Sequence, residues 1–341
     1  MDLAAKRTVG WTGVEVTQLG FGGASIGELN VIVAEDDAVD AVCAAWDKGI
    51  RYFDTAPWYG RGLSELRTGA GLRGRPRDEF VLSTKIGRWL RAPERPDAFE
   101  RAPWTGGLQM DVVFDYSYDG IMRSYEQSQL RLGMPRYDLA VIHDLDHLYH
   151  GRGARLDWYF GQLAASGFRA VEELKAAGLI RGVGAGINDL GLVPRFLDLV
   201  DLDFFLLAMP YTLLHQEILE TELPAAVARG CGFVIGSPFQ SGILATGPRP
   251  GAKYNYGDVP ADVADKVGRI QDVCARHGVP LAAAALQFPL GHPSTAAVIP
   301  GASSRAQLER NVEAFVHPIP ADLWAELKHE GLLREDAPVP A

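Results

Sequence analysis

The strongest constraint on the fold is a unit that the chain repeats about eight times: a short apolar segment followed by a stretch with helical spacing of apolar residues. The apolar segments predict strands at 18–21, 50–53, 80–85, 137–144, 179–183, 204–207, 232–235 and 296–299. Helices are predicted at 35–48, 64–71, 116–132, 161–177, 190–199, 223–229, 261–277, 281–290 and 304–315. Strands that alternate with helices form a parallel sheet. The pattern favours an α/β fold, a closed (β/α)8 TIM barrel, over two open-sheet halves.

The segments between these units complete the predicted architecture. Apolar residues alternate from Val9 to Val16 around a Thr-Gly turn, which predicts an N-terminal β-hairpin that caps the barrel floor. Three long stretches rich in Gly, Pro or aromatic residues, at 88–115, 144–160 and 237–259, are expected to be loops at the C-terminal mouth. Residues 321–331 predict an appended C-terminal helix. No linker divides the chain, so we expect one domain over residues 1–341.

The composition argues against several kinds of partner. The formal net charge of −10 and the lack of a basic run disfavour a nucleic-acid surface or an anionic membrane. The sequence contains no apolar run of about 18 residues and no apolar signal segment near Met1. Cys43, Cys231 and Cys274 are far apart and form no Cys-x-x-Cys pattern, which is typical of small buried residues in a reduced protein. We therefore expect a cytoplasmic protein without a disulfide or a bound metal.

Ionisable side chains follow three of the predicted strands, at the point where each strand ends. Asp54 and Tyr59 follow the second strand. Lys85 ends the third strand, and His143 ends the fourth. Because the carboxyl ends of parallel barrel strands meet at one mouth, we expect these side chains to form one active site.

These residue types suit proton transfer at a carbonyl oxygen that is being reduced, or at an alcohol that is being oxidised. The pKa of a tyrosine is normally near ~10, too high for ready proton exchange at neutral pH. A lysine ammonium lowers the pKa of a phenol beside it, and a carboxylate keeps that ammonium charged and oriented. A histidine can donate a second hydrogen bond to the carbonyl oxygen. The parts are present as Tyr59, Lys85, Asp54 and His143.

Each of these residues also has an ordinary structural interpretation when it is taken singly. Tyr59 is then a half-buried aromatic residue, and Asp54 is a turn or helix-cap acid. Lys85 is a solvated residue at a strand end, and His143 forms a loop pair with Asp144. The occurrence of all four at matching strand ends favours the catalytic interpretation.

At this point the sequence resembles the aldo-keto reductase superfamily over nearly its whole length. The matching motifs are Asp54-Thr55-Ala56-x-x-Tyr59, Ser83-Thr84-Lys85, Ile142-His143-Asp144, Ser237-Pro238-Phe239, Ile299-Pro300-Gly301-Ala302-Ser303-Ser304-Arg305 and Gln307-Leu308-x-x-Asn311. The resemblance implies a (β/α)8 barrel that binds a nicotinamide cofactor in extended form across its mouth. It also implies a catalytic tetrad of Asp54, Tyr59, Lys85 and His143, with Tyr59 as the general acid/base.

The same resemblance implies which residues contact the cofactor: Gly22, Asp54, Asn188, Ser237, Pro238, Gly301, Ser303, Arg305, Gln307 and Asn311. Ser303, Arg305, Gln307 and Asn311 are expected at the adenosine end. Family members commonly hold the nicotinamide carboxamide with Ser-Asn after the fifth strand and with Gln on the sixth. Here Asn188 is expected to serve after a one-residue shift, and Ala208-Met209 stand near the Gln position. Gly236 replaces the aromatic residue that usually stacks on the nicotinamide.

Cofactor preference and substrate class are predicted from two further features. Many members that use NADP have Lys where this chain has Gly301, so Arg305 is the one obvious cation left for a 2′-phosphate, which favours NAD over NADP. Segments 182–188 and 209–214 resemble the aldose 1-dehydrogenase and pyridoxal 4-dehydrogenase subgroup. That resemblance implies oxidation of a small-molecule cyclic hemiacetal, either pyridoxal or an aldose such as L-fucose, to a lactone.

Aromatic side chains are expected to line the substrate pocket, because their faces suit both sugar C–H surfaces and a pyridine ring. They are Trp58, Trp89, Trp104, Tyr211 and Phe239. Three alternatives stay open. One is an NADPH-dependent aldehyde or ketone reductase of the same superfamily, and another is a non-catalytic barrel that binds the cofactor. The third is a metal-dependent barrel hydrolase with ligands among Asp54, His143, Asp144, His147 and His150, although the chain has no His-x-His or His-Glu-x-x-His cluster.

Overall fold

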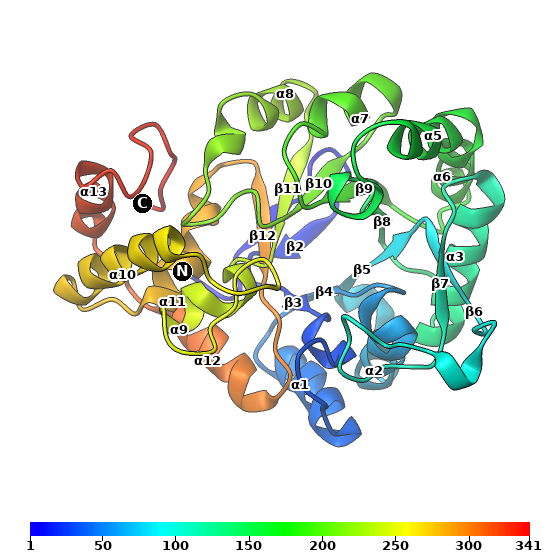
Figure 1. Cartoon of the computed structure of the whole chain (residues 1–341), viewed down its shortest axis with the longest axis horizontal. Coiled ribbons are helices and arrows are strands. Elements are labelled where there is room, and N and C mark those ends of the chain that lie inside the picture. Colours follow the sequence, from blue (N-terminus) through cyan, green and yellow to red (C-terminus); the bar gives the residue numbers. More distant parts are fainter.

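A computed structural model describes residues 1–341 and contains an eight-stranded parallel sheet (Figure 1). In sheet order the strands are β3 (Phe21–Gly22), β4 (Tyr52–Asp54), β5 (Val81–Ile86), β8 (Leu139–His143), β9 (Gly182–Ile187), β10 (Phe204–Ala208), β11 (Gly232–Gly236) and β12 (Thr295–Ile299). Each neighbouring pair is parallel. Parallel bridges from Leu19 to Val298 and from Gly22 to Gly301 join the first strand to the last. The sheet is closed, which confirms the predicted (β/α)8 barrel.

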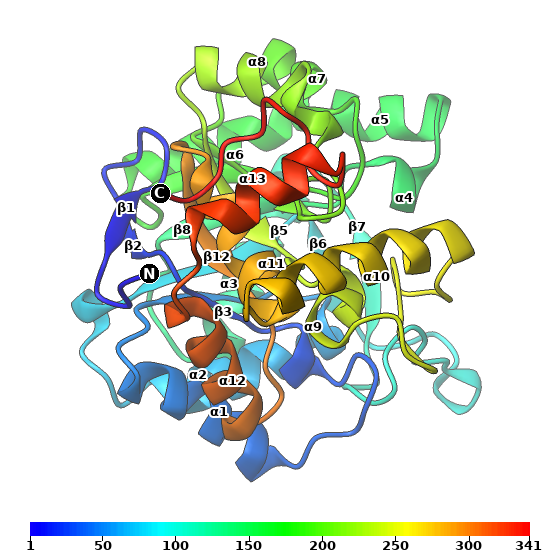
Figure 2. The same cartoon turned by 90° about the vertical axis from the view of Figure 1, so that its left-hand side faces the viewer.

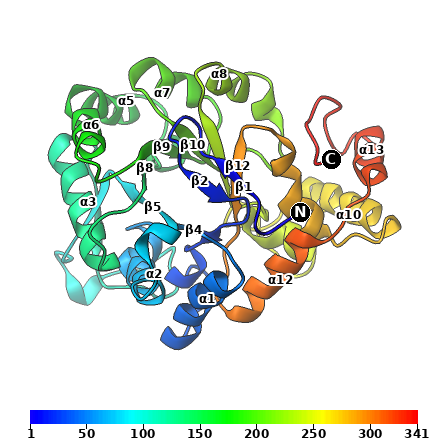
Figure 3. The same cartoon turned by 180° about the vertical axis from the view of Figure 1, so that it is seen from behind.

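Helices form a ring outside the strands (Figures 1 and 3). The helices that return the chain between strands are α1 (Glu35–Asp47), α2 (Leu63–Leu72), α3 (Tyr118–Leu132), α6 (Phe168–Ala176), α7 (Val193–Leu199), α8 (Glu222–Ala228) and α11 (Leu281–Gln287), and α12 (Arg305–Val316) follows the last strand. Their ends follow local sequence rules. At α3, for example, the Ser117 side chain accepts a hydrogen bond from the Gly120 amide, and Gly133 ends the helix at φ 64°. No helix is both long and apolar enough to cross a membrane.

Further helices extend this ring. They are α4 (His147–His150), α5 (Ala154–Gln162), α9 (Ile243–Thr246), α10 (Ala261–Arg276) and α13 (Ala321–His329). The last of these is the predicted appended helix, and it lies beside α10 on the outside of the barrel (Figure 2). Nε of Arg276 on α10 donates a 2.7 Å hydrogen bond to Glu326 on α13, so the appended helix is tied to the ring by charged side chains.

The barrel floor is closed by the N-terminal hairpin of β1 (Lys6–Thr8) and β2 (Glu15–Thr17). Figure 3 shows this hairpin crossing the end of the barrel. Val9, Val14 and Val16 are almost fully buried and belong to one apolar cluster with inward-facing residues of the strands, such as Val141 and Phe204. The prediction of a capping hairpin is confirmed. Because the hairpin closes the floor, a functional site is expected at the opposite end, the mouth formed by the carboxyl ends of the strands.

Several predicted boundaries were wrong. Segment 88–115 is not an irregular loop throughout, because β6 (Arg88–Arg91) and β7 (Asp111–Phe114) pair in an antiparallel hairpin. Segment 144–160 contains α4 and most of α5, which continues through a π-helical turn into α6. The strand predicted at 179–183 is β9, three residues later, since its Gly-rich sequence has a weak strand signal. The first barrel strand shortens to Phe21–Gly22.

Glycine in β9 makes room for a large neighbour inside the barrel. A Cβ atom built on Gly184 would lie 2.7 Å from carbon atoms of the Phe204 ring on the next strand, closer than real side chains approach. Gly184 is buried and Phe204 is fully buried, so neither the strand nor the ring can move into solvent to relieve the contact. Gly184 is therefore needed for packing.

We predict that Gly184→Ala lowers the free energy of unfolding by about 1–3 kcal/mol, because the added methyl overpacks a full interior. Urea denaturation of both proteins measures the difference. The control is Gly161→Ala on α5, where a Cβ meets nothing within 4 Å and where alanine should stabilise the helix by about 0.5–1 kcal/mol. Equal effects of the two substitutions would contradict the packing role of Gly184.

Candidate active site

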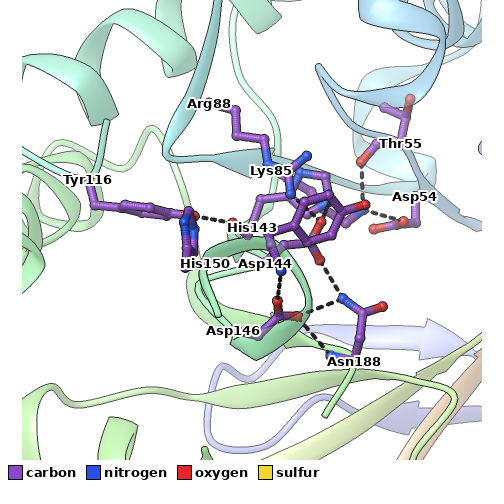
Figure 4. A network of polar contacts seen from close by, with 11 residues as sticks. Asp54, Thr55, Lys85, Arg88, Tyr116, His143, Asp144, Asp146, His150 and Asn188 are labelled. Carbon is purple, nitrogen blue, oxygen red and sulfur yellow. Dashed lines mark hydrogen bonds and ion pairs between the residues drawn. The ribbon is translucent and has the colours of Figure 1, made fainter. Parts of the chain in front are cut away.

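Asp54 and Lys85 form a buried ion pair at the carboxyl ends of neighbouring strands (Figure 4). Nζ of Lys85 lies 2.6 Å from Oδ1 of Asp54 and donates a second hydrogen bond of 2.8 Å to the Thr55 carbonyl. The Ser83 hydroxyl donates to the other carboxylate oxygen at 2.6 Å. Both charged side chains are only 1% exposed. Burial of two charges is tolerated here because each has a partner and further hydrogen bonds.

Tyr59 lies over this pair because the chain turns sharply after β4. The turn passes through left-handed backbone at Gly60 (φ 60°), Arg61 (φ 55°) and Gly62 (φ 101°) before α2 begins. A side chain at Gly60 would meet the backbone of Gly27, so the close approach of two loops requires glycine there. The turn places the Tyr59 ring centroid 4.7 Å from Nζ of Lys85. The predicted acid, lysine and tyrosine therefore lie together.

The pKa of Tyr59 differs from the sequence-based expectation. Burial raises this pKa well above its ordinary value, and the negative charges of Asp54 and Asp144 raise it further. The expectation that Lys85 would lower the pKa was wrong. Asp54 pairs with the ammonium at 2.6 Å, and its negative charge opposes the effect of the ammonium on the phenol. Tyr59 is thus a protonated phenol at neutral pH.

His143 ends β8 beside Tyr59, with the two ring centroids 5.9 Å apart and nearly perpendicular. Burial lowers the His143 pKa well below its ordinary value, and the cations of Arg88 and Lys85 lower it further, so the imidazole is neutral. Its Nε2 lies 3.2 Å from Oδ2 of Asp144, and its Nδ1 has no hydrogen-bond partner in the protein. The Tyr116 hydroxyl donates to the His143 carbonyl at 2.7 Å and holds the backbone.

A second buried ion pair lies next to His143, and the sequence did not predict it. Nη2 of Arg88 lies 2.5 Å from Oδ2 of Asp144, and Arg88 is 1% exposed. Its guanidinium carbon is 4.3 Å from the ring centroid of Phe114 and 4.2 Å from that of Tyr149. A usable signal was present, since Arg88 follows β5 two residues after its end and Asp144 directly follows His143.

Asn188 is held by two carboxylates of this site. Its Nδ2 donates to Oδ1 of Asp144 at 2.9 Å and to Oδ2 of Asp146 at 2.7 Å. Its backbone amide also donates to Asp146, at 3.1 Å. Burial and the nearby Asp144 charge raise the pKa of Asp146 to about 7. With both amide hydrogens used, the Asn188 side chain keeps only its oxygen, an acceptor, for a ligand.

The residues expected at the adenosine end surround the start of α12. The Ser303 amide and hydroxyl both donate to Oε1 of Gln307, at 2.8 and 2.9 Å, and Asn311 donates to the Gly301 carbonyl at 3.1 Å. Gly22 and Gly301 face each other across the barrel seam. Ser237 and Pro238 follow β11 at the same mouth, with Ser237 at φ 48°.

Arg305 does not extend freely from this cluster. Its Nε and Nη2 donate to the two carboxylate oxygens of Asp40 on α1, at 2.9 and 2.6 Å. A guanidinium that binds a carboxylate through two parallel hydrogen bonds has its best donor pair occupied. The cation expected at the adenosine end is therefore already paired.

The predicted aromatic residues divide into two groups. Trp58 and Trp104 pack edge to face, with centroids 5.7 Å apart, and Trp104 is 6.0 Å from Tyr59. The others lie elsewhere. Trp89 lies under Arg123 of α3, Tyr211 is fully buried against Phe288, and Phe239 packs on the main core. Only Trp58 and Trp104 are brought beside the tyrosine.

The histidines and acids named for the metal-site alternative do not gather into a ligand set. No three His, Cys, Asp or Glu side chains lie together as a metal site would need. Asp54 pairs with Lys85, and Nε2 of His150 is 3.1 Å from the Tyr116 hydroxyl.

Three comparisons relate this architecture to known proteins. The model of the Aldo/keto reductase family matches residues 18–330. A pyridoxal 4-dehydrogenase of Microbacterium luteolum is 44% identical over 98% of this chain and 99% of its own length. A D-threo-aldose 1-dehydrogenase of a Pseudomonas species is 40% identical over 94% and 96%. The solved structure of aldo-keto reductase AKR11C1 from Bacillus halodurans, in its holo form, matches with a TM-score of 0.75 and 25% identity, over 99% of this chain and 98% of that one.

We predict that Lys85→Met lowers the free energy of unfolding by about 3–5 kcal/mol, because it leaves the Asp54 carboxylate buried without a cation. The double variant Lys85→Met/Asp54→Asn removes both charges and should recover most of that loss. Urea denaturation near neutral pH measures both values. If the double variant were as unstable as the single one, the unpaired charge would not be the cause.

Proposed function

Because this chain belongs to the aldo/keto reductase family, we propose that it oxidises a cyclic hemiacetal to a lactone, with NAD as cofactor. Membership makes the chain an oxidoreductase that acts on CH–OH groups with a nicotinamide cofactor. The proposal adds the direction of the reaction, the substrate class and the choice of NAD. The observation that carries it is the convergence of Tyr59, the Lys85–Asp54 pair and His143 at one barrel mouth.

The substrate class is supported by the names of two similar proteins. One acts on pyridoxal and the other on D-threo-aldoses. Both kinds of compound carry an aldehyde that closes with a hydroxyl of the same molecule into a cyclic hemiacetal. Oxidation of such a ring at its CH–OH carbon gives a lactone directly. Trp58 and Trp104, packed beside Tyr59, offer apolar faces to either ring.

The residues of the tetrad have distinct roles in this proposal. The ionised form of Tyr59 accepts the hydroxyl proton of the substrate as the carbonyl forms. Lys85 and Asp54 form an ion pair below the Tyr59 ring. Nζ of Lys85 lies 4.7 Å from the centroid of that ring. His143 is neutral and orients the reacting oxygen through a ring nitrogen. When bound, a nicotinamide cofactor supplies the acceptor for the hydride.

The donor groups at the start of α12 fit the adenosine end of such a cofactor. A helix of this length presents free backbone N–H groups at its start, which favour anionic phosphates. Ser303, Asn311 and the Ser304 cap add hydroxyl and amide groups. In this proposal they hold the adenosine end together with Gln307 and Arg305. Gly22, Gly301, Ser237 and Pro238 contact the rest of the cofactor, and Asp54 and Asn188 lie near the nicotinamide.

The preference for NAD is supported by the pairing of Arg305 with Asp40. A 2′-phosphate would have to compete with the Asp40 carboxylate for the guanidinium, and that carboxylate would repel it. NAD carries a 2′-hydroxyl at this position and needs no cation there. The same pair therefore disfavours the alternative of an NADPH-dependent reductase.

We predict that kcat/KM for hemiacetal oxidation with NAD rises with pH between about pH 7 and pH 10 without a plateau. Only the ionised phenol accepts a proton, and the Tyr59 pKa lies above that range, so the ionised fraction grows about tenfold per pH unit. Tyr59→Phe should lower kcat by roughly a hundred- to ten-thousandfold. Initial rates of NADH formation with pyridoxal and a panel of aldoses measure both effects.

The matched control for Tyr59 is Tyr137→Phe, which removes a fully buried hydroxyl without a hydrogen-bond partner at the start of the β8 segment. It should leave the rate and the pH profile unchanged. A rate that falls as pH rises, or a Tyr59→Phe enzyme as fast as the wild type, would refute the assigned role.

We also predict that Asp40→Asn raises the ratio of kcat/KM for NADP to kcat/KM for NAD by roughly tenfold or more, because it frees Arg305 for a 2′-phosphate. Steady-state kinetics with the two cofactors measure the ratio. Glu309→Gln is the control, since Glu309 pairs with Lys48 across the same two helices with similar exposure but does not hold Arg305. An unchanged ratio in Asp40→Asn would mean that Arg305 does not reach the cofactor.

A further inference from the structure

Asp144 lies beside the group that orients the reacting oxygen. Its Oδ2 is 3.2 Å from Nε2 of His143 (Figure 4). A substrate oxygen that bonds to this nitrogen lies about 3 Å from it, so a second hydroxyl next to the first is within reach of the carboxylate. The tetrad does not use Asp144, which makes it a candidate for contact with the substrate.

The carboxylate of Asp144 is held rigidly by side chains. Arg88 lies 2.5 Å from Oδ2, and Asn188 donates to Oδ1 at 2.9 Å. Arg88 itself packs against the rings of Phe114 and Tyr149. A carboxylate can accept about four hydrogen bonds, and this one accepts from two side chains, Arg88 and Asn188. Acceptor positions therefore remain for a ligand.

An ordinary structural role for this ion pair can be tested against a second ion pair, which lies at the other end of β5 and β8. At the floor end of β5 and β8, Nη2 of Arg77 donates to Oδ2 of Asp138 at 2.6 Å. That carboxylate also accepts the Leu82 amide at 2.8 Å, so it completes backbone hydrogen bonding at the sheet edge. No backbone amide donates to the Asp144 side chain. The pair at the mouth therefore lacks the structural task of its counterpart.

We propose that Asp144 binds the substrate by accepting a hydrogen bond from a hydroxyl adjacent to the reacting CH–OH group, and that Arg88 positions the Asp144 carboxylate for this contact. The inference rests on the proposed oxidation of a hemiacetal. It makes Asp144 a specificity-determining residue, which selects hydroxylated hemiacetals over simple alcohols and aldehydes.

A single hydrogen-bond acceptor beside His143 suits both kinds of substrate. In the ring form of an aldose, the carbon next to the reacting carbon carries a hydroxyl. In pyridoxal, the reacting carbon is attached to the pyridine ring, and the neighbouring ring carbon carries a phenolic hydroxyl. A single carboxylate beside His143 can accept from either group. An ionised acceptor gives a stronger hydrogen bond than a neutral one.

The experiment compares L-fucose with its 2-deoxy analogue, with NAD as cofactor, and measures the ratio of their kcat/KM values within each enzyme. Because both rates come from one preparation, a smaller folded fraction cancels from the ratio. The wild type should prefer the 2-hydroxy sugar by roughly ten- to a hundredfold. Asp144→Ala and the charge-balanced double variant Arg88→Met/Asp144→Asn should lose most of this preference.

The control variant is Asp138→Asn, which alters the matched ion pair at the floor and should keep the wild-type ratio. The positioning role of Arg88 is tested with two further variants. Arg88→Met should reduce the ratio of the two kcat/KM values, and Arg88→Lys should restore part of it. If Arg88 were purely structural, neither substitution would change this ratio. Equal losses for both sugars in Asp144→Ala would overturn the inference.

The outcome also separates this inference from the proposed function. A wild type that oxidises both sugars equally well overturns the role of Asp144 and leaves hemiacetal oxidation intact. A wild type that reduces no NAD with any hemiacetal of the panel overturns the proposed function, and the inference falls with it.

Discussion

The site depends on one constraint, which is that a charge inside the barrel needs an opposite charge held at hydrogen-bond distance. Lys85 and Asp54 satisfy it because β4 and β5 are neighbours in parallel register, so their carboxyl ends place the two side chains 2.6 Å apart. Thr55 and Ser83 supply the remaining partners. The closed barrel makes this arrangement rigid. The Lys85 ammonium is therefore held in a fixed position beneath the Tyr59 ring.

The same constraint operates a second time at the mouth, with a different result. Arg88 and Asp144 are also buried and paired, and they lie beside His143. Burial lowers the pKa of His143, and the cations of Arg88 and Lys85 lower it further, so the imidazole is neutral. A neutral imidazole can orient an oxygen without acting as an acid. The barrel thus holds a phenol with a raised pKa beside an uncharged histidine, with the two ring centroids 5.9 Å apart.

Strand order made part of the site predictable from the sequence, whereas the part that depends on three-dimensional packing was missed. Asp54, Lys85 and His143 were found because carboxyl ends of parallel strands share one edge. The β6–β7 hairpin was missed because its two short strands are separated by a stretch rich in Gly and Pro. Arg88 was missed although it follows β5 by two residues, because its pairing with Asp144 also depends on that hairpin. The Tyr59 pKa was misjudged because the burial of the phenol, which raises this pKa most, cannot be read from residue types.

The seam of the barrel has a consequence for how the fold responds to a ligand. The first barrel strand, β3, has two residues, and the seam between it and β12 is joined by isolated bridges. The helices on either side of this seam, α1 and α12, are linked by two exposed ion pairs. An opening of the ring at this seam would break a small set of backbone hydrogen bonds between residues 18–22 and 298–300, together with the packing of α1 on α12. A dinucleotide that contacts both Gly22 and α12 would bridge units almost three hundred positions apart in the chain, and its binding energy would oppose that opening.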